Sequence, residues 1–483
     1  MPRFYITTPI FYLNDKPHLG TAYAVVAADV IARWHRLKGD DVFYLTGTDE
    51  HGEKVEKKAI EGGLSPQEHV DRLSENFKEA WKKLSITNNG FIRTTEKRHE
   101  SAVKHFIKLM NESGDIYQGA YEGWYCTSDE TFIPEPQLKD GKCPECGREV
   151  RKLKEETYFF RLSRYQDRLL QHYGANPGFI LPKTRANEVI NRVKDGLKDL
   201  SITRPSVKWG IPFPLNEKHT IYVWVDALVN YLSALGWPEV KPKYWPADIH
   251  LVGKDINWFH SAIWPAMLMS AGLDIPKAVF VTGHYLVDGR KMSKSLGNAV
   301  DPLGLSEKYS VDAFRYFLMR EMPLGDDGNF SERQLRERAN NELAADFGNL
   351  VYRVLTLAES FKGELKGKPE LEKELELKAY SEAMDRCDTF KALDILWRFI
   401  KASNRYVNEK KPWALNGEDL GNALYNMLEA CRVIAILSSP FMPNAAESTC
   451  SQLGTSMGRF EDCRFSEINY LPKRGAPLFA KTE

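Results

Sequence analysis

The apolar and polar positions at the start of the chain change from strand spacing to helix spacing and back. Residues 3–8 are β-prone, residues 20–37 carry apolar side chains at helical intervals, and residues 41–46 form a second β-prone run. A strand, a helix and a strand in this order predict a βαβ unit with parallel strands and a right-handed crossover. We therefore expect a doubly wound, Rossmann-like α/β fold.

The same order of elements returns later in the chain, and helical spacing dominates after it. Residues 249–253 and 278–282 have the pattern of strands, with a helix expected near 260–272. Beyond about residue 326 the β-prone runs fade, and residues 363–378 form a Lys- and Glu-rich stretch that we interpret as a solvated linker or helix start. Long helical patterns flank that stretch, at 333–357, 379–407 and 422–437.

These patterns predict a catalytic α/β domain that is interrupted by an insertion and followed by a helical bundle. The insertion carries a cysteine pair and a cluster of Lys and Arg. The predicted division is 1–115 for the first half of the α/β domain, 116–200 for the insertion, 201–325 for the second half, and 326–483 for the helical domain and carboxy-terminal tail.

Composition fits a folded protein with several cores. The chain has 483 residues, 43% of them hydrophobic, with 66 basic and 66 acidic side chains, so any contact with nucleic acid must use local patches. Its amino end lacks a charged region followed by an apolar core, and no run of about 18 apolar residues occurs. We expect a cytoplasmic protein that does not enter a membrane.

A first candidate for chemistry is Pro17-His18-Leu19-Gly20-Thr21, where the loop after the first strand enters a helix. Helix amino ends expose unpaired N–H groups that suit phosphate, and glycine lets a ligand approach the backbone. His18 can donate to a phosphate oxygen or cap the helix, and the motif by itself leaves both readings open.

A second candidate is the loop that runs from Asp288 to Asn298 and contains Lys291 and Lys294. Two ammonium groups between glycines can stabilise the charge that develops on a transferring phosphate. The alternative is an exposed basic turn. The sequence contains neither of the glycine-rich patterns typical of phosphate loops and dinucleotide-binding folds.

The cysteine-bearing segment has the spacing of a metal site. Cys126 and Asp129 form one close pair, and Cys143 and Cys146 form another after thirteen intervening residues. Three thiolates and a carboxylate are an acceptable ligand set for structural Zn²⁺, and seven cysteines in a chain of this length are too few for a disulfide framework. A metal-free knuckle with reduced thiols is the alternative.

The two phosphate motifs, in this order, resemble the paired signatures of class I aminoacyl-tRNA synthetases. The usual second histidine of the first signature is replaced by Thr21. The resemblance implies ATP with Mg²⁺ as its counter-ion, and it implies catalytic roles for His18, Gly20, Lys291, Lys294 and Arg204. By the same resemblance the ATP-binding residues are His18, Gly20, Thr21, Gly253, Asp255, Lys291, Ser293 and Lys294.

Nearly the whole chain is similar to the methionyl family within this class. Asp49 matches the carboxylate that holds the substrate ammonium, and aromatic side chains suit a soft thioether. Leu228 stands where a common family pattern has proline. The implied methionine-binding residues are Ile10, Tyr12, Asp49, Trp224, Ala227, Leu228, Tyr231, His260 and Trp264.

The resemblance also implies transfer RNA as a partner. Asn349 and Arg353, four apart on one helix face, and Trp413 match anticodon-reading positions. The family implies service to the methionine tRNAs, the initiator included, and a monomer is expected. Two alternatives stay open: a class I synthetase for cysteine, leucine, isoleucine or valine, and a catalytically silent tRNA-binding relative.

Overall fold

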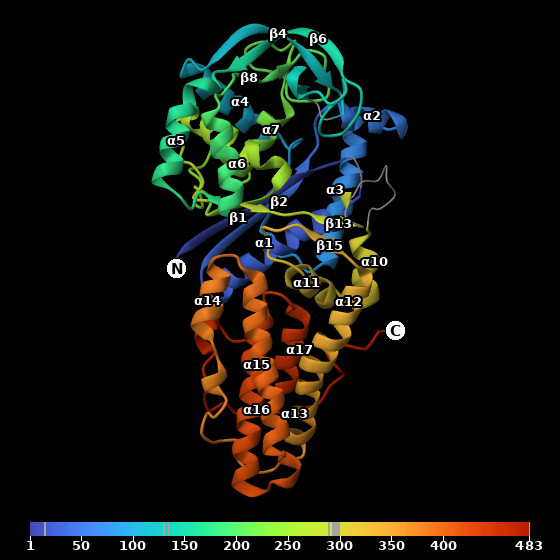
Figure 1. Ribbon diagram of the computed structural model, residues 1–483, viewed down its shortest axis with the longest axis vertical. Helices are drawn as coiled ribbons and strands as arrows, with labels where there is room; N and C mark the ends of the chain where they lie inside the picture. Colours follow the sequence, from blue (N-terminus) through green and yellow to red (C-terminus); the bar gives the residue numbers. More distant parts are fainter. Residues whose placement is uncertain (14–15, 129–130, 134, 288–289, 292–299, 483) are drawn as a thin grey trace.

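A six-stranded parallel sheet lies near the middle of the molecule, at the base of its upper half (Figure 1). The computed structural model describes residues 1–13, 16–128, 131–133, 135–287, 290–291 and 300–482. Every neighbouring pair of strands in this sheet is parallel, which confirms the predicted α/β class. In sheet order the strands are β3 (Gly90–Arg93), β2 (Asp41–Asp49), β1 (Arg3–Tyr12), β11 (Ile249–Gly253), β12 (Val279–Thr282) and β7 (Ile180–Leu181).

The first crossover is the predicted βαβ unit. Helix α1 (Leu19–Leu37) joins β1 to β2, and thirteen of its side chains are buried, because its Ala and Val residues present apolar surface on most sides. Both strands extend beyond the predicted ends, since β1 reaches Tyr12 and β2 reaches Asp49. Helices α2 (Glu53–Glu61), α3 (Pro66–Lys83) and α4 (Lys97–Glu112) follow along this half.

The expected insertion builds a separate antiparallel sheet above the parallel one (Figure 1). Its strands, in sheet order, are β5 (Thr131–Ile133), β4 (Ile116–Cys126), β6 (Arg151–Phe160) and β8 (Leu200–Ser201). Helices α5 (Gln166–Ala175) and α6 (Lys183–Lys194) belong to the same stretch of chain. Between them, β7 returns to the parallel sheet and pairs with β12.

The second half supplies short elements around the carboxyl ends of the parallel strands. They are β9 (Thr203–Arg204), β10 (Thr220–Ile221), α7 (Val223–Leu228), α8 (Asn230–Ser233), a π-helical turn (Phe259–Ile263) and α9 (Trp264–Ala271). Next comes a small sheet of β13 (Tyr285–Val287), β14 (Arg290–Lys291) and β15 (Gly328–Phe330). The sequence pattern predicts few strands beyond about residue 326, but β15 lies just after that position.

Helices form the lower half of the molecule (Figure 1). The predicted helix over 379–407 is two helices, because Cys387, in a left-handed conformation with φ of 58°, breaks the pattern. The predicted helix over 333–357 contains a π-helical segment (Ala339–Gly348). The helices are α10 (Pro302–Tyr309), α11 (Val311–Arg320), α12 (Glu332–Arg338), α13 (Asn349–Glu359), α14 (Leu377–Asp385), α15 (Thr389–Lys410), α16 (Gly417–Ser438) and α17 (Pro443–Leu453).

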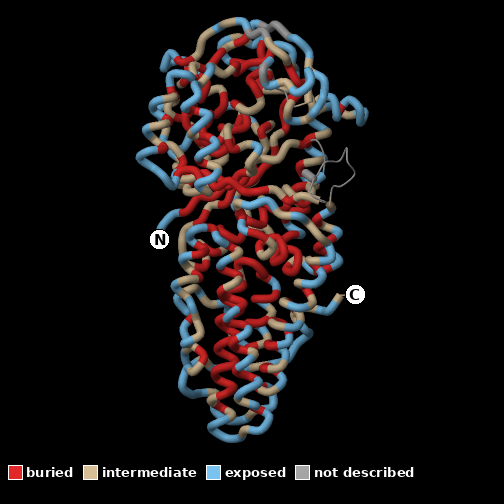
Figure 2. The backbone as a smooth tube through the Cα atoms, in the orientation of Figure 1, coloured by how far each residue is buried: buried red, intermediate tan, exposed pale blue. Residues whose placement is uncertain are grey.

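A buried guanidinium joins the two halves. Arg315 of α11 is fully buried; it donates to the Asp29 carboxylate of α1 at 2.7 Å and to the carbonyl oxygens of Pro440 and Phe441, each at 3.0 Å. One apolar core continues from α1 into the bundle, and Figure 2 shows buried residues running along both. Among the described helices, none is long and apolar enough to cross a membrane.

Candidate active site

A cavity of about 280 Å³ opens between the ends of β1 and β2 and helix α7. Its walls come from segments that are more than 170 residues apart in the sequence, since Asp49 lies opposite Val223 and its neighbours. Eight of the nine expected methionine-binding residues line it: Ile10, Tyr12, Asp49, Trp224, Ala227, Leu228, Tyr231 and His260.

The pairing of β1 with β2 determines where Asp49 lies in this cavity. The parallel register sets Tyr12 beside Asp49 and Ile10 beside Gly47, after an irregularity between Thr7 and Ile10. Gly47 is required there, because a Cβ atom would lie 2.1 Å from the Ile92 carbonyl oxygen. The carboxylate of Asp49 therefore sits at the end of a strand, on a rigid part of the site.

Aromatic side chains from α7, α8 and the π-helical turn form the opposite wall. Trp224 stacks on Phe259 with ring centroids 4.0 Å apart. The Tyr231 hydroxyl and the His260 Nε2 atom lie 2.7 Å apart, and both side chains are buried. Polarizable rings and a nearly dry surface suit a thioether better than a charged or hydroxylated side chain.

Hydrogen bonding fixes the tautomer of His260. Its Nδ1 atom lies 3.0 Å from the Ile256 carbonyl oxygen, which only accepts, so Nδ1 carries the proton and Nε2 accepts from Tyr231. Burial lowers the pKa of His260 to about 4, although the Ile256 carbonyl and Asp255 favour its charged form. This wall of the cavity is therefore uncharged at neutral pH.

Trp264 was expected to line the cavity, but it lies in the core next to the lining residue Tyr231. It is fully buried, with its ring centroid 6.2 Å from that of Tyr231 and 5.6 Å from that of Phe106. It supports the aromatic wall from behind.

Sequence reasoning missed several residues of the cavity. Asn230 is buried, its Nδ2 atom donates to the Ala227 carbonyl at 2.7 Å, and its amide oxygen has no partner within the described part of the chain. Ser128 belongs to the cysteine segment, and no signal in the sequence connected that segment to the cavity. The missed lining residues are Pro9, Phe11, Lys54, Ser128, Val223, Asn230 and Ile256.

The first phosphate motif forms the amino end of α1. His18 is the N-cap, and its Nδ1 atom accepts from the Gly20 N–H at 3.1 Å, which leaves Nε2 as the protonated nitrogen of a neutral ring. The Thr21 hydroxyl donates to the His18 carbonyl at 2.7 Å and accepts from the His18 N–H at 3.0 Å. His18 and Thr21 thus form a capping box at the end of the helix where phosphate binding is expected.

Of the second motif the structure describes only Arg290 and Lys291, which form β14. Lys291 pairs through its backbone with Leu286 of β13, while Ser293 and Lys294 lie outside the described residues. After the motif, the Val300 carbonyl oxygen accepts a hydrogen bond from the Leu19 N–H at 3.1 Å. Val300, the first described residue after the motif, is therefore held beside the first turn of α1.

A second, more polar cavity of about 560 Å³ is lined in part by Leu286, the β13 residue that pairs with Lys291. Asp255 lines it, and one carboxylate oxygen lies 3.3 Å from the His284 Nε2 atom. At Gly253 a Cβ atom would come within 2.8 Å of that carboxylate, so the glycine lets Asp255 fold back over the strand end. Lys254 also lines the cavity and forms an ion pair with Asp327 at 2.5 Å.

Arg204 is buried on β9, behind the aromatic wall. Its guanidinium lies over the Tyr222 ring, 4.2 Å from the centroid, and donates to the Thr203 carbonyl at 2.7 Å and to the Ser201 hydroxyl at 2.9 Å. Tyr222 directly precedes α7, so Arg204 supports the helix that carries Trp224.

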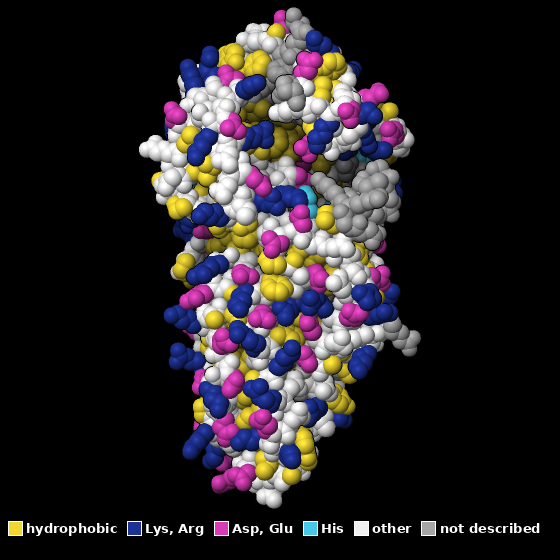
Figure 3. All heavy atoms as spheres, viewed as in Figure 1, with side chains coloured by type: hydrophobic (Ala, Val, Ile, Leu, Met, Phe, Trp, Pro, Cys, Tyr) yellow, Lys and Arg dark blue, Asp and Glu magenta, His cyan; other side chains and the backbone are white. Residues whose placement is uncertain are grey.

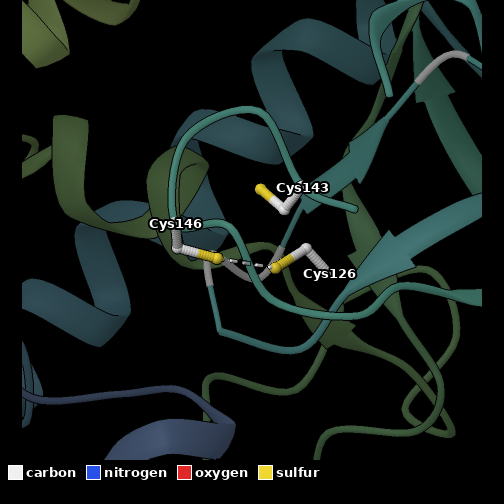
Figure 4. A group of neighbouring side chains, drawn as sticks. All are labelled: Cys126, Cys143 and Cys146. Atoms are coloured by element: carbon white, nitrogen blue, oxygen red, sulfur yellow. Dashed lines mark hydrogen bonds between the residues drawn. The ribbon is translucent and has the colours of Figure 1, made fainter. Parts of the chain in front are cut away.

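Three of the four predicted metal ligands lie together in the insertion (Figure 4). The Sγ atoms of Cys126, Cys143 and Cys146 are all within 4.8 Å of one another, and those of Cys126 and Cys146 are 3.5 Å apart. Four thiolates around zinc would be separated by roughly 3.8 Å, from a Zn–S distance of about 2.3 Å. The cluster therefore fits a zinc ion, while Asp129 lies outside the described residues.

The expected anticodon residues lie on the helical bundle. Asn349 is exposed at the start of α13, and the Arg353 guanidinium donates to the Asn408 side chain of α15 at 3.0 Å. Trp413 is 60% exposed just after α15. On the face drawn in Figure 3, basic and acidic side chains are interspersed over the bundle, in keeping with the balanced charge.

Two family models together match most of the chain. The model for tRNA synthetases class I (M) matches residues 4–155 and 149–355. The model for the anticodon binding domain of methionyl tRNA ligase matches residues 363–478.

Similar proteins are alike over nearly the full chain. The methionine–tRNA ligase of Thermotoga maritima is 50% identical, and the match covers 100% of this chain and 80% of that protein. The methionine–tRNA ligase of Caldanaerobacter subterraneus subsp. tengcongensis is 47% identical, and the match covers 99% of this chain and 79% of that protein. The structure of Mycobacterium tuberculosis methionyl-tRNA synthetase in complex with methionyl-adenylate superposes with a TM-score of 0.93 at 40% identity, covering 99% of this chain and 100% of that one. With this agreement in sequence and in fold, the chain belongs to the methionyl family of class I tRNA synthetases.

Proposed function

We propose that this chain is a methionine–tRNA ligase that activates L-methionine with ATP and transfers it to methionine tRNA. In the first step a carboxylate oxygen of methionine attacks the α-phosphorus of ATP, and the bond to pyrophosphate breaks. In the second step a hydroxyl of the terminal ribose attacks the methionyl carbonyl carbon and releases AMP. The observation that carries the proposal is a single cavity that is lined both by the carboxylate of Asp49 and by an uncharged aromatic wall that contains Trp224, Tyr231 and His260.

The cavity residues divide into two roles. Asp49 binds the substrate ammonium, and Trp224, Tyr231 and His260 surround the thioether together with the other lining residues. Since neither step needs a protein nucleophile, catalysis comes from orientation and from stabilisation of phosphate charge. Arg204 acts by holding Tyr222 and the start of α7.

The nucleotide is proposed to lie between α1 and the second motif, with Mg²⁺ as the counter-ion of its phosphates. His18 donates from Nε2, Gly20 permits close approach, and Thr21 fixes the His18 backbone. Asp255 borders the polar cavity that would receive the nucleoside, and Gly253 leaves room for the Asp255 carboxylate. Lys291, Ser293 and Lys294 complete the proposed ATP-binding set.

Two further parts of the chain have supporting roles in this proposal. Zinc held by Cys126, Cys143, Cys146 and Asp129 would brace the insertion, and a site with four protein ligands leaves no open position for chemistry. Asn349, Arg353 and Trp413 would read the anticodon of initiator and elongator tRNAs. We propose a cytoplasmic monomer, divided at residues 115, 200 and 325 as the sequence predicts.

An ATP–pyrophosphate exchange assay with each of the twenty amino acids tests the proposal. Exchange that depends on methionine alone supports it, and exchange with another amino acid favours a synthetase of that specificity. No exchange with any amino acid, together with tRNA binding, would indicate a silent relative.

The Lys291→Ala variant is expected to lose exchange about 100-fold or more, because a cation that stabilises transferring phosphate is removed.

A further inference from the structure

A chain of buried polar side chains runs behind the methionine cavity. The Asp226 carboxylate has one oxygen 2.7 Å from the His51 Nδ1 atom and the other 2.7 Å from the His99 Nε2 atom. The His99 Nδ1 atom in turn lies 2.8 Å from the Ser233 hydroxyl. All four residues are buried, and Asp226, His99 and Ser233 are fully so. Such a chain is costly to bury unless every member is satisfied.

This series of hydrogen-bonded side chains connects the two walls of the methionine cavity. His51 follows Asp49 by two residues, in the loop that leaves β2. Asp226 lies on α7 between Trp224 and Ala227, which both line the cavity. The His51–Asp226 contact therefore fixes the separation between the carboxylate that would hold the ammonium and the wall that would receive the side chain.

Helix α4 anchors this bridge from behind. His99 is on α4 and holds the second oxygen of Asp226, while Ser233 is at the end of α8. A helix as short as α7, with six residues, has little stability of its own, so tertiary contacts must set its position.

The pKa shifts of Asp226 and His51 agree with a strong contact between these two side chains. Burial by itself raises the pKa of the Asp226 carboxyl, but the charge of His51 and hydrogen bonds from both histidines outweigh burial and hold that pKa below its usual value. Burial lowers the pKa of His51, and the adjacent Asp226 carboxylate more than reverses this, with Glu100 and Glu50 adding to the rise. Hydrogen bonds to a charged carboxylate are stronger than neutral ones, so the contacts of Asp226 resist displacement.

We propose that Asp226 is a positioning residue that sets the distance between Asp49 and the aromatic wall and thereby determines the affinity and length selectivity for methionine. The proposal rests on the proposed function. Asp226 acts through its neighbours: helix α7 carries Trp224, Ala227 and Leu228 to the cavity, and the bridge to His51 keeps that helix at the correct distance from Asp49.

The Asp226→Asn variant tests this role, because it keeps the shape of the side chain and removes its charge. In methionine-dependent ATP–pyrophosphate exchange we expect the KM for methionine to rise about 30-fold, as expected when one partner of a buried charged pair is removed. The KM for ATP should stay within about twofold. The preference for methionine over its S-ethyl homologue, measured as a ratio of kcat/KM, should fall at least fivefold.

The matched control is Glu429→Gln, which also neutralises a fully buried carboxylate, paired with Arg432 at 2.7 Å, but in the helical bundle. It should lower the thermal midpoint without changing the KM for methionine. If Asp226→Asn lowers the midpoint and leaves both the KM and the selectivity ratio unchanged, Asp226 is only structural and the proposal is wrong. If that variant does not fold, His99→Gln decides by the same two readouts. Failure of the wild type to exchange with methionine would instead overturn the proposed function.

Discussion

The backbone N–H of Leu19 donates to the carbonyl oxygen of Val300 at 3.1 Å, across 281 positions of sequence. Leu19 begins α1 directly after His18, and Val300 follows the second lysine motif. One hydrogen bond thus holds the residue that follows the lysine motif at the helix terminus where phosphate is expected. This contact supports the proposal that the two signatures belong to one site.

Two substitutions of His18 separate its two possible roles, which are to cap α1 and to donate to a phosphate oxygen. His18→Asn keeps a side chain that can cap α1 but removes the Nε2 donor, whereas His18→Ala removes both. We expect both variants to lose methionine-dependent exchange about 100-fold or more, and only the alanine variant to lose about 1 kcal/mol of stability. Exchange kinetics and chemical unfolding measure these effects. Wild-type exchange by His18→Asn would limit His18 to capping.

The buried His260 should make stability depend on pH. Its pKa is about 4 in the folded protein against an ordinary value of 6.5, so between these values the unfolded chain binds a proton that the folded chain does not. Stability should therefore fall as pH drops from 6.5 towards 4, by at most about 3 kcal/mol from this residue. Unfolding of wild type and His260→Gln across this range measures the difference. Parallel curves for the two proteins would contradict the assignment.

Loss of the cysteine cluster should remove bound metal and loosen one edge of the methionine cavity. We expect Cys126→Ser to bind less than one tenth of the zinc that the wild type binds and to unfold at a lower temperature. Because Ser128 lines the cavity two residues later, the KM for methionine should also rise several-fold. Metal analysis and thermal unfolding are the measurements.

The control for the metal prediction is Cys450→Ala, which alters a buried thiol of α17 outside the cluster. Its zinc content should equal that of the wild type. Equal zinc content in Cys126→Ser would show that the cluster is a reduced, metal-free knuckle.

Trp413 tests the role of the bundle in binding tRNA. An indole that is 60% exposed can stack on a base, and such stacking contributes about 1–3 kcal/mol. We expect Trp413→Ala to raise the KM for tRNA in aminoacylation about 10-fold and Trp413→Phe to retain most of the affinity. Leu471→Ala, at a side chain that is 77% exposed, provides the control. Equal KM values for Trp413→Ala and the control would exclude stacking.

Local patterns were enough to predict the α/β class and the first βαβ unit, whereas the resemblance to a known family supplied eight of the fifteen residues that line the cavity. Hydrophobic spacing defined α1 and β11 to within about one residue, because each element buries a continuous apolar face. His18 was visible because a phosphate contact depends on residue type and on position at a helix end, whereas Asp49 was indicated only by the family resemblance. The break at Cys387 was missed, since nothing in a helical pattern indicates a left-handed residue.

Relations between distant segments were decided only by folding. That β7 joins the parallel sheet, that Ser128 reaches the cavity, and that Asp226 bridges His51 and His99 all depend on contacts between elements far apart in the chain. A buried aspartate in a short helix has the same sequence signal as a solvated one. Its partners are fixed by packing, because only the folded core excludes the water that would otherwise satisfy it.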